Sequence, residues 1–486
     1  MSQEADMQTA ADQTSTSPPR WDLRQFAAVL LNWLRNDVFR RTESSPVGWR
    51  KILLAAGCLV FAIAVSLSRT VGAGSLNTIW IEDAKFLLDQ GLNHSFWSAL
   101  ASPISSYYQE PARIFTEIAL QFPLSWTPGV MAIFAAAEYA MYGLVAYIAS
   151  GPHLRSPWLR LLIAAPVCAI PLAYTQVNND LVTVQFFGLY GAFWTVLWIP
   201  GTRAGRILSP LVMATVSWTA VLSMVFAPLI LARLLVDRSK NAWALAVIWA
   251  GGVWLQLSET ILGRSHHLSY GSNSPLFVLN NYAARVVPRA LFGERSLGGA
   301  GVDYTGDKTV PLHITNGAAH AALIGCAWAV VIVVVVLAVI RFTDPNWTLA
   351  GVAVVFSVGI FGEEMLINTA VVQPRYVIAP AMLLYTALIA LMRPRLREGA
   401  AAGASTAIRW LPDAGTAIRW LPAAGFALLL LVAVTLNFRV TNGRTTSPAW
   451  TSVVASAHHD CTMPHVSAYT FVHEWWFVTI PCSKVG

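Results

Sequence analysis

Long apolar runs alternate with short polar segments from about residue 51 to residue 440. The first run reads KILLAAGCLVFAIAVSLS, and a later one contains CAWAVVIVVVVLAVI. A helix rises about 1.5 Å per residue, so about 20 residues cross a hydrocarbon core roughly 30 Å thick. Helices also satisfy their own backbone hydrogen bonds in lipid. The pattern therefore predicts an all-α polytopic membrane protein, a bundle of about 10–11 transmembrane helices with extracytoplasmic loops.

The apolar runs also set the boundaries of the individual helices. The predicted spans cover residues 52–68, 128–150, 158–174, 181–199, 241–259, 317–340, 347–369, 377–392 and 421–437. The segment 207–233 starts and ends with basic residues and contains Pro210 and Pro228. We therefore expect two short broken spans, or a re-entrant hairpin, in that segment.

Polar segments flank and interrupt the transmembrane domain, which we expect to cover residues 51–440. Residues 1–50 predict a disordered cytoplasmic tail followed by a basic, amphipathic helix, WDLRQFAAVLLNWLRNDVF, lying on the membrane surface. Residues 1–20 contain no apolar stretch of the kind found in a cleavable signal peptide, so we expect none there. The longest polar segments inside the domain, 69–125 and 260–316, are expected to be outer loops, and 441–486 a small extracytoplasmic tail.

Basic residues give the predicted orientation. Only 12% of the residues are charged, and the net charge is +7. Arg40, Arg41, Arg50 and Lys51 precede the first span, and the later basic clusters can all face the same side. The positive-inside rule then places the N-terminus in the cytoplasm and loop 69–125 outside the plasma membrane. Because this rule accounts for the positive charge, we expect no nucleic-acid partner.

The five cysteines fall into two groups. Cys58, Cys168 and Cys326 lie in predicted spans and behave as small apolar residues. Cys461 and Cys482 both lie in the outer tail, where an oxidising environment favours a disulfide. Such a bridge contributes about 3 kcal/mol of stability.

An acidic pair, Glu82 and Asp83, follows the first span within the apolar context NTIWIEDAKFLLDQG. One interpretation is that the pair lies at the start of a helix, where negative side chains interact favourably with the helix dipole. The other is a general base, because a carboxylate held beside an apolar wall has a pKa shifted toward working pH.

Two outer arginines are candidate phosphate ligands. Arg113, next to Glu110 in QEPARIFTE, either reaches the membrane interface or binds an anionic headgroup or diphosphate together with its neighbours. Arg375 and Tyr376, in VVQPRYVIAP, start a span on the side where positive charge is disfavoured, which suits a lipid phosphate. An ion pair with Glu363 or Glu364 is the alternative for Arg375.

The other intramembrane or turn acids are expected to line a cavity, because an acid facing lipid is costly. These are Asp180, Glu363 and Glu364. His458, His459 and Asp460, and separately His266 and His267, lack the spacing of a metal site, so we expect no metal ligands.

Three patches resemble the GT-C superfamily of membrane glycosyltransferases in order and sidedness. They are WIEDAKFLLDQG, SSYYQEPARIFTEIALQFPLSW and QPRYVIAP. The resemblance implies a polyprenyl-phosphate-linked sugar donor, a glycan, lipid or protein acceptor of the cell envelope, and inversion at the sugar. It implies Asp83 as the base, with Glu82 as alternate or helper, and Arg375 and Arg113 as phosphate ligands.

Two points stay open after this comparison. Many members carry Asp-Asp or Asp-Glu where this chain has Glu-Asp, so the sequence does not decide which carboxylate is the base or whether a divalent cation takes part. A transporter or flippase of lipid-linked glycans and a non-catalytic membrane protein of envelope biogenesis are the alternatives. A transporter should carry charges near the middle of several spans. In this chain such charges are few and gather toward the predicted outer side.

Overall fold

A computed structural model describes most of the chain. The described residues are 23–42, 48–104, 107–172, 178–262, 274–294, 317–367, 374–395, 414–439, 443–473 and 476–485. The longer helices are α1 Leu23–Trp33, α2 Trp49–Leu67, α5 Glu110–Ala119, α6 Thr127–Ala149, α9 Gln185–Leu197, α10 Arg203–Ser217, α11 Ala227–Val236, α12 Lys240–Ile261, α15 Gly317–Val339, α16 Trp347–Ile367, α17 Ile378–Leu391, α18 Ala414–Leu436 and α20 Trp450–Cys461. The shorter helices are α3 Asp89–Asn93, α4 Phe96–Leu100, α7 Pro157–Ala164, α8 Pro166–Ala169, α13 Pro275–Asn281, α14 Val287–Phe292 and α19 Gly443–Thr446.

Each predicted span coincides with helical structure. The segment 207–233 is broken, as predicted, since α10 and α11 are separated by a short 3₁₀ helix, Val221–Phe226. Within the predicted span 158–174, α7 and α8 form the part up to Ala169, with a break before Pro166, and residues 173 and 174 lie outside the described chain. The amphipathic segment near the N-terminus forms α1.

Five helices among the described residues are long and apolar enough to cross a membrane. They are Trp49–Leu67, Leu124–Ala149, Ala321–Val339, Trp347–Leu366 and Ala417–Leu436. Shorter apolar helices lie at Pro157–Ala169, Val221–Val236 and Arg375–Leu391. The chain is therefore a mostly helical membrane protein, while 10–11 passes stays a prediction.

The surface of α2 supports this class. Only 6% of its apolar window is buried within the protein, and Leu54 and Phe61 are 69% and 71% exposed. Such a helix would expose a large apolar surface to water, so lipid is its natural environment.

The core lies around α9 and α17, whose residues are all buried. α9 packs against α6, α10 and α17. The Tyr190 hydroxyl donates a hydrogen bond to the carbonyl of Ile163 at 2.9 Å and lies 3.1 Å from the Thr386 hydroxyl. These contacts join α9 to α7 and α17 in the interior of the bundle.

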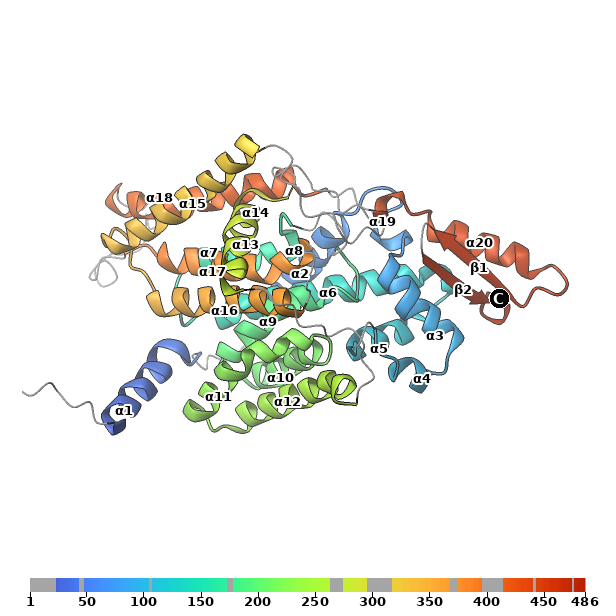
Figure 1. Cartoon of the computed structure of the whole chain (residues 1–486), viewed down its shortest axis with the longest axis horizontal. Coiled ribbons are helices and arrows are strands. Elements are labelled where there is room, and N and C mark those ends of the chain that lie inside the picture. Colours follow the sequence, from blue (N-terminus) through green and yellow to red (C-terminus); the bar gives the residue numbers. More distant parts are fainter. Residues whose placement is uncertain are drawn as a thin grey trace, which may run out of the picture.

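The C-terminal tail forms a small unit at one end of the molecule, with α1 at the opposite end (Figure 1). Strands β1 Ala468–His473 and β2 Trp476–Pro481 pair antiparallel, and the predicted disulfide joins Cys461 to Cys482, which confirms that pairing. The hairpin was missed in the all-α prediction, because strands of six residues resemble loop segments in an apolar chain.

The hairpin is attached to the segment between α2 and α6. The Thr479 amide donates to the Asp89 carboxylate at 2.7 Å, and the Asn93 side chain donates to the Thr479 carbonyl at 2.8 Å. The tail therefore packs on α3 and on the helical turn that carries the acidic pair.

Candidate carboxylate–arginine site

The acidic pair starts a π-helical turn, Asp83–Leu88, and its two side chains have different environments. Asp83 is only 3% exposed, and each of its oxygens accepts a backbone hydrogen bond. The Leu181 amide donates at 3.0 Å and the Val182 amide at 3.1 Å. Two fixed donors hold this carboxylate against the turn before α9.

Asp180, in the same turn, is fully buried and interacts with Asp83. Neither oxygen of Asp180 has a hydrogen-bond donor among the described residues. Burial, and then the neighbouring charge of Asp83, raises the pKa of Asp180 well above its usual value of 3.8. Both effects favour the protonated form of Asp180 in the folded protein, in which its proton can bridge the two carboxyl groups.

Arg444 supplies the buried positive charge behind this pair. It donates to the Thr78 hydroxyl at 3.0 Å and to four backbone carbonyls, those of Ser75, Thr78, Asn178 and Asn179. Burial lowers its pKa, and the charge of Asp83 opposes that shift. A guanidinium stays charged in proteins, so Arg444 offsets Asp83 electrostatically.

A glycine allows Arg444 to reach this position. Gly72 has a φ of +76°, and a Cβ built there would lie 2.5 Å from the carbonyl oxygen of Thr445. The segment that follows α2 can therefore approach α19 this closely only because residue 72 has no side chain.

Glu82 faces Arg375. One guanidinium nitrogen of Arg375 lies 3.2 Å from a Glu82 oxygen, and the side chains are 20% and 16% exposed. The Arg375 guanidinium carbon lies 5.8 Å from the ring centre of Phe186 and 5.6 Å from that of Tyr376. Glu364, the partner considered from sequence, interacts electrostatically with Tyr376. Arg375 is thus held between an acid and two aromatic rings.

Tyr107 and Gln185 complete the cluster and were not predicted from sequence. The Gln185 side chain donates to the Tyr107 hydroxyl at 3.3 Å. Burial raises the pKa of Tyr107, while the nearby charge of Arg375 acts in the opposite direction. The patch SSYYQEPAR contains Tyr107, but no local signal distinguishes it from Tyr108, whose backbone instead pairs with the side chain of Gln256.

Arg113 and Glu110 have other contacts. Arg113 donates to the Gln90 side chain at 2.8 Å, to the Phe86 carbonyl at 3.3 Å and to the Ser102 carbonyl. These bonds hold α5 against the rest of the segment between α2 and α6. Burial raises the pKa of Glu110 to about 7, against the effect of Arg113. Their role in phosphate binding stays a prediction.

Of the remaining predicted residues, Glu364 adjoins the site through Tyr376, and the others lie on described helices or outside the described chain. Glu363 and Glu364 lie on α16, and one oxygen of Glu363 is buried without a hydrogen-bond partner. His458 and His459 are exposed on α20. Within the described residues no group of three metal-ligating side chains occurs, and His266 and His267 lie outside them.

No protein-family model matches this sequence, and no curated protein matches it.

The site therefore contains three carboxyl groups, on Glu82, Asp83 and Asp180, which we call the carboxylate cluster. Two arginines, Arg375 and Arg444, accompany it. With Asp180 protonated, two negative and two positive charges remain. Such a site can hold a base next to a cation that binds an anion.

Proposed function

We propose that this protein is a glycosyltransferase of the outer face of the plasma membrane. It moves a sugar from a polyprenyl-phosphate donor to a glycan, lipid or protein acceptor of the cell envelope, with inversion. The observation that carries the proposal is the ion pair between Glu82 and Arg375, because it sets a carboxylate beside a cation suited to a lipid phosphate.

The two carboxylates of the acidic pair are suited to different roles. Both oxygens of Asp83 accept backbone hydrogen bonds, and the side chain is almost fully buried. Glu82 is more exposed, and its second oxygen accepts no hydrogen bond among the described residues. We therefore assign Glu82 as the base and Asp83 as a positioning residue, the reverse of the order implied by the family resemblance.

Donor binding then prepares the base. The phosphodiester of the donor carries one negative charge and competes with Glu82 for Arg375, because its two unesterified oxygens can accept hydrogen bonds from both ends of the guanidinium. Once Arg375 turns to the phosphate, the Glu82 carboxylate can accept a proton from the acceptor hydroxyl. The acceptor oxygen bonds to the anomeric carbon, and the bond from that carbon to the phosphate oxygen breaks. The polyprenyl phosphate leaves with the electron pair, and Arg375 stabilises its charge.

The experiment compares Glu82→Gln, Arg375→Gln and Glu117→Gln, each expressed in a strain that lacks the wild-type gene. Glu117 is a half-buried acid on α5 in the same loop and serves as the matched control. We expect the first two variants to lose the envelope glycan that the wild type restores, and the control to restore it. A wild-type glycan profile from Glu82→Gln and Asp83→Asn alike would overturn the proposal.

Donor affinity gives a second readout. Glu82→Gln removes the competitor of the phosphate, so the variant should bind a sugar-free polyprenyl phosphate more tightly. A partly exposed ion pair contributes up to about 1 kcal/mol, which corresponds to about a fivefold gain. Arg375→Gln should weaken binding of the same lipid. Weaker binding by Glu82→Gln would contradict the competition between Glu82 and the donor phosphate.

A further inference from the structure

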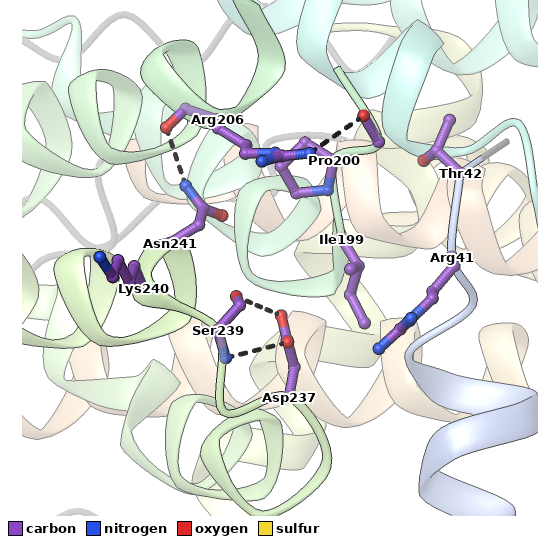
Figure 2. A pocket seen from close by; sticks show the side chains of 10 residues that line it. Arg41, Thr42, Ile199, Pro200, Arg206, Asp237, Ser239, Lys240 and Asn241 are labelled. Carbon is purple, nitrogen blue, oxygen red and sulfur yellow. Dashed lines mark hydrogen bonds between the residues drawn. The ribbon is translucent and has the colours of Figure 1, made fainter. Parts of the chain in front are cut away.

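A second polar site lies at the opposite end of α9 and α10 from the carboxylate cluster. α9 begins beside Tyr107 at Gln185 and ends at Leu197, so its 13 residues separate the two sites by about 20 Å. Here a pocket of about 530 Å³ opens, within the size range of small-molecule sites. Its lining residues are Arg41, Thr42, Ile199, Pro200, Gly201, Arg206, Asp237, Ser239, Lys240 and Asn241 (Figure 2).

A smaller pocket adjoins the first and shares two of its residues, Arg41 and Ile199. It adds Arg35 and Arg40 from the segment that follows α1. We call the two together the basic pocket, because five of their lining residues are Lys or Arg.

Most of the positive charge here is not neutralised by the protein. Asp237 accepts hydrogen bonds from the Ser239 amide at 3.2 Å and the Ser239 hydroxyl at 3.1 Å, as Figure 2 shows. Asp37 pairs with Arg40 at 3.2 Å. Among the described residues, no hydrogen bond or ion pair engages the side-chain charge of Arg41 or Lys240.

The frame of the pocket is held by specific contacts. The Thr42 amide donates to the Ile199 carbonyl at 3.3 Å, and the Trp198 indole donates to the Thr42 hydroxyl at 3.1 Å. The Asn241 side chain donates to the Arg206 carbonyl at 2.8 Å. Three separate segments are thus joined before any ligand arrives, so the cations are arranged in advance.

Apolar side chains that face outward flank the charges. Ile207, Leu235 and Trp243 are 70%, 59% and 55% exposed, and each lies within three residues of a pocket residue in the sequence. They belong to α10, α11 and α12. A ligand that is anionic at one end and apolar at the other would satisfy both surfaces.

We infer that the basic pocket binds the phosphate-bearing headgroup of an anionic phospholipid, with the acyl chains lying along α10 to α12. Arg41, Arg206 and Lys240 contact the headgroup. This site is independent of the proposed transferase activity, because it lies at the other end of the bundle from the carboxylate cluster.

The test uses the purified full chain in vesicles of phosphatidylcholine, with or without phosphatidylglycerol, and native mass spectrometry to count retained lipids. The double variant Arg41→Gln/Lys240→Gln should retain phosphatidylglycerol about 30-fold more weakly, since each basic residue near an anionic surface contributes about fivefold. The control Arg203→Gln/Arg238→Gln removes the same charge from exposed residues outside the pocket and should retain it like the wild type.

Three outcomes decide the inference. Loss of lipid in the double variant alone supports it. Equal loss in both variants overturns it, because retention would then depend on total charge rather than on the pocket. The third arm adds inorganic phosphate to protein in phosphatidylcholine vesicles. If phosphate alone raises the unfolding temperature of the wild type as much as phosphatidylglycerol does, the ligand is a free anion and the lipid assignment is overturned.

Discussion

Asp83 and Asp180 interact with each other, yet replacement of each by asparagine should affect the stability of the protein differently. Asp83→Asn replaces one carboxylate oxygen by an amide NH₂ group, although both oxygens accept backbone hydrogen bonds. Whichever way the amide turns, a donor then faces the Leu181 or the Val182 amide. Asp180→Asn replaces one neutral group by another, and its NH₂ can donate to Asp83 as the carboxyl proton does.

The magnitudes follow from these contacts. A buried donor left without an acceptor costs about 1–3 kcal/mol, so Asp83→Asn should destabilise the protein by at least that amount. It also leaves the charge of Arg444 without its nearest counter-charge. Below pH 3.8, where Asp180 is protonated in both the folded and the unfolded chain, Asp180→Asn exchanges one hydrogen bond for another and should change stability by less than about 1 kcal/mol.

The pH dependence separates the two residues further. Because the pKa of Asp180 is raised on folding, its contribution to stability is fully present below 3.8 and is lost as pH rises through the folded-state pKa. The Asp180→Asn variant has no carboxyl group at this position, so it does not lose this stability as the pH rises. Relative to the wild type, the variant should therefore become more stable as the pH rises above 3.8.

The measurement is the unfolding temperature of the purified full chain in detergent, taken across this pH range for both variants. A clear loss of stability for Asp83→Asn, with little change for Asp180→Asn near pH 3.8 and a growing gain over the wild type at higher pH, is the expected pattern. If Asp180→Asn is as destabilising as Asp83→Asn at every pH, Asp180 is ionised in the folded protein, and the charge balance argued for the site is wrong.

Three further changes test other parts of the structure. Gly72→Ala should destabilise by about 1–2 kcal/mol from its left-handed backbone alone and further from the contact with Thr445. Gly57→Ala, inside α2 and with open space around it, should instead stabilise by up to about 1 kcal/mol in the same thermal assay, because alanine is the better helix former. Reduction of the C-terminal disulfide should lower stability by about 3 kcal/mol, and a chain lacking both of its cysteines should show no response to reductant. Glu110→Gln should remove a loss of stability that the wild type shows as pH rises from 4.5 through about 7, and an unchanged pH profile would contradict the burial argument.

The helices were predictable from sequence because span length and apolar composition are local properties. The acidic pair and the Arg375 element were also visible locally, as charges in apolar surroundings. The sequence could not show that Glu82 and Arg375 meet, since 293 positions separate them. Arg444 carried no signal at all, because a lone arginine in a polar tail looks like any surface residue until its five hydrogen bonds are seen. Contacts of this kind depend on the whole chain rather than on periodicity.

The position of Arg444 has a consequence for biogenesis. This residue bonds to Thr78, 366 positions earlier in the chain, and is therefore synthesised long after the acidic pair. During translation, the acidic pair therefore enters its surroundings without the buried cation that it will need. The carboxylate cluster is completed only when the segment with α19 arrives, so a ribosome that stops before α19 releases a helical bundle in which the buried acids lack Arg444.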